Sequence, residues 1–245
     1  TGCLKQILIG GESLGRSLAV TVRKEFSKTD LIDIYGSTET ASCDFFSFPD
    51  TFSKYPGSIG KPSGGVTYRI VDLNNKPVRL GEEGELQIFS PYLMNGYLDE
   101  AELTQKSFSG KWFKTGDIVK EVGPLVLELM GRSKELISRG GNKISPGEIE
   151  QAICSHRSVI AAMAVGIADD ILGERIHVLI IPNSLSKISV FEVKTHLKKC
   201  LEKYKIPDVF YFGIALPVGG TGKADRSYFK RQILSGELTP SSQQT

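Results

Sequence analysis

The sequence predicts a mixed α/β protein in two parts, the end of one domain followed by a small, separate α+β domain. Three observations support this fold class. Residues 1–45 follow a strand–helix–strand pattern, residues 46–131 carry short alternating apolar runs between glycines and prolines, and residues 132–234 alternate helix and strand. The polar tail, residues 235–245, is expected to be disordered.

Composition describes an ordinary globular chain. Of its 245 residues 40% are hydrophobic and 24% charged, and the net charge of +2 gives no argument for nucleic acid or an anionic membrane as a partner. No apolar run reaches the 18 or more residues of a transmembrane segment. Four scattered cysteines and three scattered histidines form neither a disulfide framework nor a zinc-ligand spacing, as expected for a cytoplasmic protein. Because the chain begins at Thr1 and enters a strand almost at once, we expect a missing N-terminal part of the same protein.

The first 45 residues predict a βαβ unit. Ile7–Ile9 is a short apolar strand and Leu31–Tyr35 a second one. Between them lies a helix with an apolar face, formed by Leu14, Leu18, Val22 and Phe26. A crossover helix implies parallel strands, and ligands tend to bind at the carboxyl ends of such strands.

Two loops occupy those carboxyl ends. The first is Gly10-Gly11-Glu12 and the second is Tyr35-Gly36-Ser37-Thr38-Glu39. Each combines glycine or hydroxyl groups with one carboxylate. Either loop alone could be an ordinary turn, but their coincidence at one sheet edge favours a binding site.

Residues 46–131 predict a small, mostly antiparallel β-subdomain or distorted barrel. A helix is expected to start near Asp99, and Phe113–Asp117 is expected to be a polar loop, with a plain β-turn as the alternative. The expected strands are Thr67–Val71, Glu85–Phe89, Ile118–Glu121 and Leu125–Met130.

The stretch Met130–Glu150 connects the two parts. Lys134 lies where the sequence changes character, and Gly140 and Gly141 can take positive φ without steric cost. Ser145 with Glu148 predicts a capping box at the start of a helix.

The second part predicts three helices and three strands. The helices start at Pro146, Ser189 and about Arg226, the second with a capping box to Glu192, and the last ends at Leu234. Val159–Ile167, Arg175–Ile181 and Val209–Phe212 are the expected strands.

The loop Leu216–Lys223 is rich in glycine and ends in a lysine. It does not follow the nucleotide P-loop pattern, because proline and alanine occupy positions that require glycine and a hydroxyl residue. Lys223 on such a loop could neutralise developing charge on a phosphate, although an exposed loop lysine is the plainer alternative.

Four side chains together describe a nucleotide site. Asp117 could accept both hydroxyls of a ribose, and Tyr35 could offer a ring face to a base. Glu39 suits magnesium, which prefers carboxylate oxygens and substrate phosphates. With Lys223 as the phosphate-neutralising group, the sequence predicts a nucleotide site shared between two domains.

These motifs, in this order, resemble those of the adenylate-forming (AMP-binding) superfamily, which contains acyl- and aryl-CoA ligases and the adenylation domains of peptide synthetases. The resemblance covers nearly the whole chain to about residue 234. Its motifs are Gly10-Gly11-Glu12, Tyr35-Gly36-Ser37-Thr38-Glu39, Gly84-Glu85-Leu86 with Gly96-Tyr97, Thr115-Gly116-Asp117, the stretch Gly131–Glu150, and Gly222-Lys223.

The resemblance implies a role for each matched residue. Asp117 would hold the ribose with Arg132 beside it, Glu39 would bind magnesium, Lys134 would be the hinge, and Lys223 would be the catalytic lysine. Nucleotide binding would fall to Gly10, Gly11, Glu12, Tyr35, Gly36, Ser37, Thr38, Asp117, Arg132 and Lys223. Coenzyme A would face Ser138, Arg139, Gly140 and Gly141.

It also implies an architecture and an activity. Residues 1–131 would end a large adenylation domain, and residues 132–234 would be a mobile C-terminal domain. The enzyme would use ATP, magnesium and coenzyme A to convert a carboxylic acid first to an acyl-AMP and then to a thioester. A carrier-protein pantetheine is the alternative acceptor, and a non-catalytic nucleotide- or partner-binding fragment is the alternative from another class. The family's phosphate-binding loop is absent, so this piece alone is not expected to complete the reaction.

Overall fold

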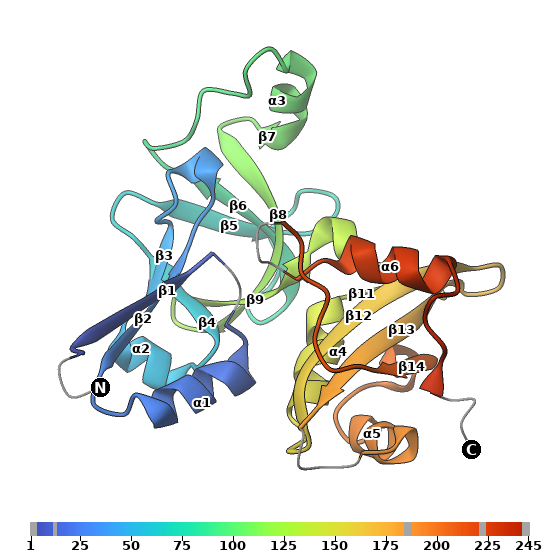
Figure 1. Cartoon of the computed structure of the whole chain (residues 1–245). Helices are drawn as coiled ribbons and strands as arrows, with labels where there is room; N and C mark the ends of the chain where they lie inside the picture. Colours follow the sequence, from blue (N-terminus) through green and yellow to red (C-terminus); the bar gives the residue numbers. More distant parts are fainter. Residues whose placement is uncertain (1–3, 12–13, 184–187, 221–223, 242–245) are drawn as a thin grey trace. The chain divides into compact units, whose positions relative to one another are not determined.

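A computed structural model describes residues 4–11, 14–183, 188–220 and 224–241. The chain divides into two compact units, Thr1–Ser133 and Lys134–Thr245, each with its own sheet and core. Figure 1 shows the first unit in blue to green and the second in yellow to red. This mixed α/β architecture confirms the predicted fold class.

The first unit begins with the predicted parallel pair. Strand β1 (Gln6–Gly10) pairs in parallel with β2 (Asp30–Tyr35), and helix α1 (Arg16–Glu25) connects them. The predicted apolar face of the helix is wrong at Leu18, which is 54% exposed, while Ala19 is fully buried. The reason is that Leu14 lies outside the helix, before Gly15 with φ of 61°, so it does not share the helical period.

Seven further strands complete the sheet of the first unit, all in antiparallel pairs. The path runs β1-β2-β3-β4-β9-β8-β6-β5, with β7 beside β8. Its core includes the fully buried Phe45, Leu86 and Leu127. The additional elements are β3 (Phe45–Ser47), α2 (Pro49–Lys54), β4 (Ser58–Pro62), β5 (Thr67–Val71), β6 (Glu83–Phe89), α3 (Ala101–Ser107), β7 (Phe108–Ser109), β8 (Trp112–Gly123) and β9 (Val126–Arg132).

The expected polar loop at Phe113–Asp117 is wrong, because β8 runs through it. Two steps along β6, from Glu85 to Gln87, lie opposite four steps along β8, from Ile118 back to Lys114. The extra residues form a bulge around Gly116, whose φ is 72°. A bulge re-aims side chains without ending the strand, which is why a turn-like sequence is found inside a long strand.

The second unit is a sheet covered on both faces. Helices α4 (Pro146–Cys154) and α5 (Val190–Leu197) pack on one face, and α6 (Arg226–Leu234) packs on the other through Phe229. Strand order is β11-β10-β13-β12, with β14 also beside β13. These strands are β10 (Ile137–Arg139), β11 (Asn142–Ile144), β12 (Val159–Asp169), β13 (Gly173–Pro182) and β14 (Val209–Phe212).

One of the two predicted capping boxes is present. Ser189 and Glu192 exchange the expected hydrogen bonds at the start of α5. The predicted box at Ser145 is wrong, because the Ser145 side chain makes no capping bond to α4. Glu148 instead pairs with Lys205 at 2.7 Å, a partner 57 positions away that no local pattern reveals.

Candidate active site

The turn after β2 is held in one conformation by its own side chains. It contains the short 3-10 helix η1 (Thr38–Thr40). The Ser37 amide donates to the Thr40 hydroxyl at 3.1 Å, and that hydroxyl donates in turn to the buried carboxylate of Asp44. A side chain at Gly36 would meet the Ser42 backbone at 2.4 Å, so only glycine fits there. The turn therefore presents Thr38 and Glu39 from a rigid base.

Asp117 is the centre of a buried polar cluster. Its Oδ2 accepts a 2.5 Å hydrogen bond from the Tyr35 hydroxyl, and its Oδ1 lies 2.7 Å from Nε of Arg132. The carboxylate is 4% exposed, whereas most of the Arg132 side chain is exposed. Burial, reinforced by the Asp117 charge, raises the pKa of Tyr35 well above its usual value, so the phenol stays a neutral donor.

The β8 bulge is what places this carboxylate. Thr115 donates from Oγ1 to the Leu86 carbonyl at 2.8 Å and accepts from the Asp117 amide at 3.0 Å. One hydroxyl thus supplies hydrogen bonds that the interrupted ladder lacks. Asp117 is directly opposite Arg132 in the β8–β9 register. The Thr-Gly-Asp motif therefore has a structural reason: the threonine fixes the bulge that aims the aspartate.

Glu39 is oriented by a second tyrosine. Its Oε1 accepts from the Tyr97 hydroxyl at 2.9 Å, and its carbonyl accepts from the Met94 amide at 2.8 Å. Burial acts to raise the pKa of Glu39, but hydrogen bonds from its backbone, Tyr97 and Ser37 and the charge of Arg132 outweigh it and lower the pKa. Glu39 is therefore an ionised carboxylate at neutral pH.

A single ionised carboxylate of this kind fits magnesium. Among the described residues no group of three or more histidine, cysteine or acidic side chains could enclose a metal ion. Magnesium is commonly held by one or two carboxylates together with substrate phosphates, rather than by an all-protein cage. Glu39 has the donor chemistry for that mode.

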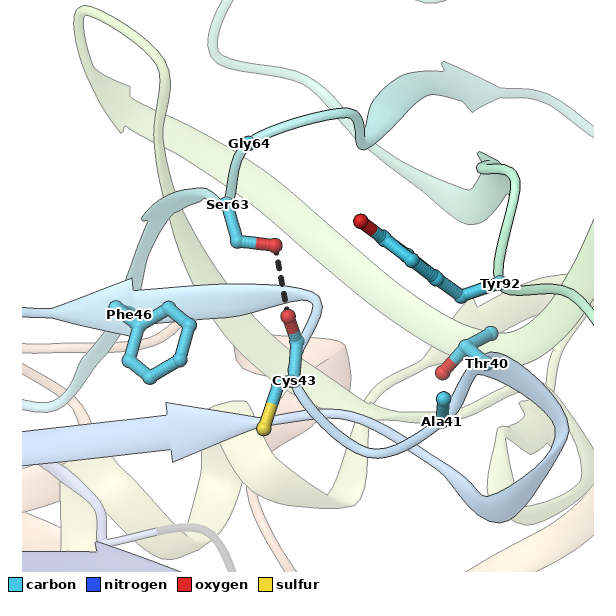
Figure 2. Close-up of a pocket in the computed structure, with 7 residues that line it drawn as sticks. All are labelled: Thr40, Ala41, Cys43, Phe46, Ser63, Gly64 and Tyr92. Atoms are coloured by element: carbon cyan, nitrogen blue, oxygen red, sulfur yellow. Dashed lines mark hydrogen bonds between the residues drawn. The ribbon is translucent and has the colours of Figure 1, made fainter.

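A cavity of about 370 Å³ opens beside the same turn, lined in part by Thr40, Cys43 and Tyr92. Figure 2 shows the rings of Phe46 and Tyr92 to either side of a 2.7 Å hydrogen bond from Ser63 to the Cys43 carbonyl. The cavity provides room for a small organic group next to the segment that carries Glu39.

In the second unit, Gly140 and Gly141 form the tip of the β10–β11 hairpin. Their φ angles are 55° and 81°, as predicted, and both residues are exposed. Arg139 is different, because its guanidinium donates to the Tyr204 and Ile206 carbonyls and to Asp208 at 2.5–3.1 Å. Its side chain holds the hairpin against the segment before β14.

Ser138 is likewise engaged within the unit. Its amide donates to Glu174 at 2.6 Å, and its hydroxyl accepts from Lys143 at 2.5 Å. Lys134 is exposed within the 3-10 helix η2 (Ser133–Glu135). Of the four residues predicted to face coenzyme A, the two glycines at the hairpin tip are the most accessible.

Four predicted site residues belong to two loops, Gly10-Gly11-Glu12 and the loop that ends in Lys223. Gly10 and Gly11 are exposed at the end of β1, and Gly11 has φ of 88°. Glu12 and Lys223 lie outside the described residues.

Sequence reasoning gave no role to Thr115 or to the Tyr97 ring, although both lie in quoted motifs. Asp44 was missed entirely, and its only sequence signal is a charged residue at the start of an apolar strand. These omissions share a cause, since each side chain acts through a partner that is brought close only by the fold.

Comparison with known proteins identifies the family. Residues 1–98 match the AMP-binding enzyme family, and residues 148–223 match the AMP-binding enzyme C-terminal domain. A probable CoA ligase of Humulus lupulus is 34% identical over 227 residues, covering 91% of this chain and 43% of the relative. Sulfoacetate–CoA ligase of Cupriavidus necator is 33% identical over 197 residues, covering 80% of this chain and 38% of the relative.

Solved structures agree. The o-succinylbenzoate–CoA synthetase of Bacillus subtilis, in complex with its acyl-adenylate intermediate, matches with a TM-score of 0.79 and 29% identity. That match covers 92% of this chain and 46% of the solved chain. The chain therefore belongs to the adenylate-forming AMP-binding enzyme family. It spans less than half the length of the curated relatives described above.

Among the described residues, no helix combines the length and the apolar character needed to cross a membrane.

Proposed function

We propose that the complete protein is an ATP-dependent carboxylate–CoA ligase that forms an acyl-AMP and then an acyl-CoA thioester. The observation that carries the proposal is the buried Asp117 carboxylate, held between Tyr35 and Arg132 at 2.5 and 2.7 Å. A pre-oriented carboxylate of this kind suits the two hydroxyls of a ribose. Family membership and relatives named as CoA ligases support the same activity.

In the first half-reaction, an oxygen of the substrate carboxylate attacks the α-phosphorus of ATP. The bond from that phosphorus to the bridging oxygen of the β-phosphate breaks, and pyrophosphate leaves. Asp117 would hold the ribose, with Tyr35 stacking its ring face on the adenine and Arg132 adding positive charge. Lys223 would stabilise charge on the α-phosphate and the carboxylate.

Glu39 would hold the magnesium ion that accompanies ATP. When bound, magnesium neutralises phosphate charge and makes pyrophosphate a better leaving group. The lowered pKa of Glu39 supports this role, because the carboxylate is ionised over the whole neutral range. Tyr97 would keep its orientation through the 2.9 Å hydrogen bond.

In the second half-reaction, the sulfur of a thiol attacks the acyl carbonyl. The acyl–phosphate bond breaks, AMP leaves, and the thiol proton passes to solvent. A rotation about Lys134 would exchange Lys223 for the Gly140–Gly141 tip, since one site must serve two different transition states. Bare glycine backbone lets the narrow pantetheine arm approach closely.

Coenzyme A is the acceptor we favour, because the curated relatives described above are CoA ligases. A carrier-protein pantetheine would use the same thiol chemistry and remains the second acceptor to test. The location we expect for the protein is the cytoplasm.

The test is ATP–pyrophosphate exchange by the complete protein with a panel of aliphatic, aryl and amino acids. Exchange that depends on one class of acid is the expected result and names the substrate class. Adding coenzyme A should then release AMP and form a thioester. A folded protein that exchanges pyrophosphate with no acid would instead favour a non-catalytic nucleotide-binding protein.

A further inference from the structure

The second unit contains a partly buried ionic network that the reaction scheme above does not use. Arg226, the first residue of α6, bonds to two carboxylates. Its Nε lies 2.8 Å from Glu135, while Nη2 donates to Glu150 at 3.0 Å and Nη1 also contacts Glu150. The side chains are 24%, 37% and 16% exposed for Arg226, Glu135 and Glu150, so the network is largely shielded from solvent.

The network closes an open sheet edge. Strand β12 is the last strand of its sheet, and Ala164 lies in its middle. The Ala164 amide donates to Glu150 at 2.7 Å, and its carbonyl accepts from Arg226 at 3.4 Å. Because α4 and α6 pack on opposite faces of the sheet, this ion pair joins the two helices around the edge. It therefore fixes the start of α6.

Charge keeps the arginine in place. Burial acts to lower the pKa of Arg226, but the charges of Glu150 and Glu135 outweigh it and raise the pKa above its usual value. Two carboxylates around one guanidinium also mean that Glu150 alone can hold Arg226 in its buried position. Glu135 is the more exposed partner, and its bond to Arg226 connects α6 to a different segment of the unit.

The segment that Glu135 connects to α6 is the one proposed as the hinge. Glu135 directly follows Lys134, and Arg226 follows Lys223 by three positions. The bond between Glu135 and Arg226 joins residues 91 positions apart in the chain. Without it, the connection from Lys134 to Arg226 is less direct and runs through β10, β11 and α4 to the Arg226–Glu150 pair. The hairpin tip at Gly140 and Gly141, in contrast, follows Lys134 directly through β10.

We propose that Glu135 and Arg226 are a positioning pair, which ties the base of the Lys223 loop to the hinge segment so that Lys223 is placed accurately for adenylation. The proposal rests on the proposed function, in which Lys223 acts in the first half-reaction and the Gly140–Gly141 tip in the second. The proposal predicts that the first half-reaction depends on Glu135 and that the second does not.

The experiment uses E135Q in the complete protein, since this variant leaves the buried Arg226–Glu150 pair intact. Pyrophosphate exchange should fall roughly 10–100-fold in kcat, the scale of a small misplacement of a catalytic group, with little change in KM for ATP. Thioester formation from supplied acyl-adenylate should stay within twofold. E135D keeps the charge on a shorter side chain, and its kcat for pyrophosphate exchange should lie between those of E135Q and the wild type. E202Q instead removes the ion pair between the exposed Glu202 and Lys205 and should change neither half-reaction.

A double-variant comparison separates positioning from support of the fold. If Glu135 acts through Lys223, E135Q should have no further effect on exchange in a K223A background. Equal loss of both half-reactions in E135Q, or a full additional loss on top of K223A, would show a structural role and overturn the proposal. Full exchange activity in E135Q would also overturn it. Full exchange activity in the K223A single variant would instead remove Lys223 from the proposed function. That result is distinct from the E135Q outcomes, which test the positioning pair.

Discussion

The hydroxyl of Tyr35 and the carboxylate of Asp117 lie 2.5 Å apart although 82 positions separate them in the chain. Tyr35 ends β2, and Asp117 emerges from the β8 bulge. A neutral phenol beside a buried carboxylate fixes the carboxylate by donation and leaves its charge in place. This contact unites two motifs that the sequence could only place separately.

Replacing Tyr35 with phenylalanine tests that contact. Y35F keeps the ring but removes the hydroxyl donor. The loss of one hydrogen bond to a buried carboxylate costs about 1–3 kcal/mol. We expect the free energy of unfolding to fall by that amount and the KM for ATP to rise about tenfold, with kcat changed less. Urea unfolding and exchange kinetics measure the two effects.

Tyr228→Phe is the matched control, because that tyrosine is 44% exposed on α6 in the other unit. It should change neither quantity. An unchanged KM for ATP in Y35F would remove the Tyr35–Asp117 contact from nucleotide binding.

Thr115 offers a second test, at the bulge itself. T115V preserves shape but removes the hydroxyl that bonds to Leu86 and to the Asp117 amide. We expect a loss of about 1–3 kcal/mol in unfolding free energy and weaker ATP binding, because the bulge no longer aims Asp117. T115S retains the hydroxyl and should remain close to wild type in both. If T115V binds ATP normally by calorimetry, the bulge does not depend on this hydroxyl.

The sequence predicted elements best where local chemistry decides them. Strands Thr67–Val71 and Val209–Phe212 and helix Arg226–Leu234 have the predicted bounds, since glycine, proline and capping residues mark their ends. It failed where a distant partner decides. Glu148 turns from its predicted cap to Lys205.

The candidate site shows the same division. The φ > 0 conformations of Gly140 and Gly141 could be predicted because only their own backbone matters. The Arg139 guanidinium binds carbonyls and a carboxylate 65–69 positions later, and Thr115 binds a carbonyl 29 positions earlier. Long-range partners of this kind carry no local pattern, so they become visible only when the chain is folded.

Asp44 predicts a pH dependence of stability. Burial raises its pKa from 3.8 to about 6, against the lowering effect of the Thr40 hydroxyl and the Ser37 backbone. The folded state therefore holds this proton more tightly than the unfolded chain between about pH 3.8 and 6. The stability that protonation supplies is fully present at the lower limit and is lost as the pH rises through 6.

D44N should remove that dependence, because the amide is neutral at every pH. The quantity to measure by urea unfolding is the unfolding free energy of D44N minus that of the wild type. We expect this difference to rise by about 1–3 kcal/mol from pH 4.5 to pH 7.5, because the wild type loses stability over that range. Asp33, whose pKa burial also raises to about 6, is present in both proteins and cancels in the difference. A difference that stays constant with pH would contradict the assignment.

The hairpin tip provides a test of the second half-reaction. G141A forces alanine to φ of 81°, which costs roughly 1–2 kcal/mol, and adds a methyl group to an exposed backbone surface. We expect thioester formation from acyl-adenylate to slow about tenfold while pyrophosphate exchange stays within twofold. Gly236→Ala carries a similar strain, with φ of 76° and open space around it, and should lose stability alone. Equal behaviour of the two variants would show that the tip does not face the thiol.

Lys223 carries the sharpest consequence of the proposed chemistry. Removing one preorganised group that stabilises developing charge typically costs 10²–10³-fold in rate. K223A in the complete protein should therefore lose pyrophosphate exchange by roughly that factor, yet form thioester from supplied acyl-adenylate at a normal rate. The control is Lys198→Ala, an exposed lysine on the solvated side of the α5 segment, which should leave both reactions unchanged. Normal exchange by K223A would make Lys223 the exposed loop lysine of the plainer alternative, and the charge on the α-phosphate would then need another partner.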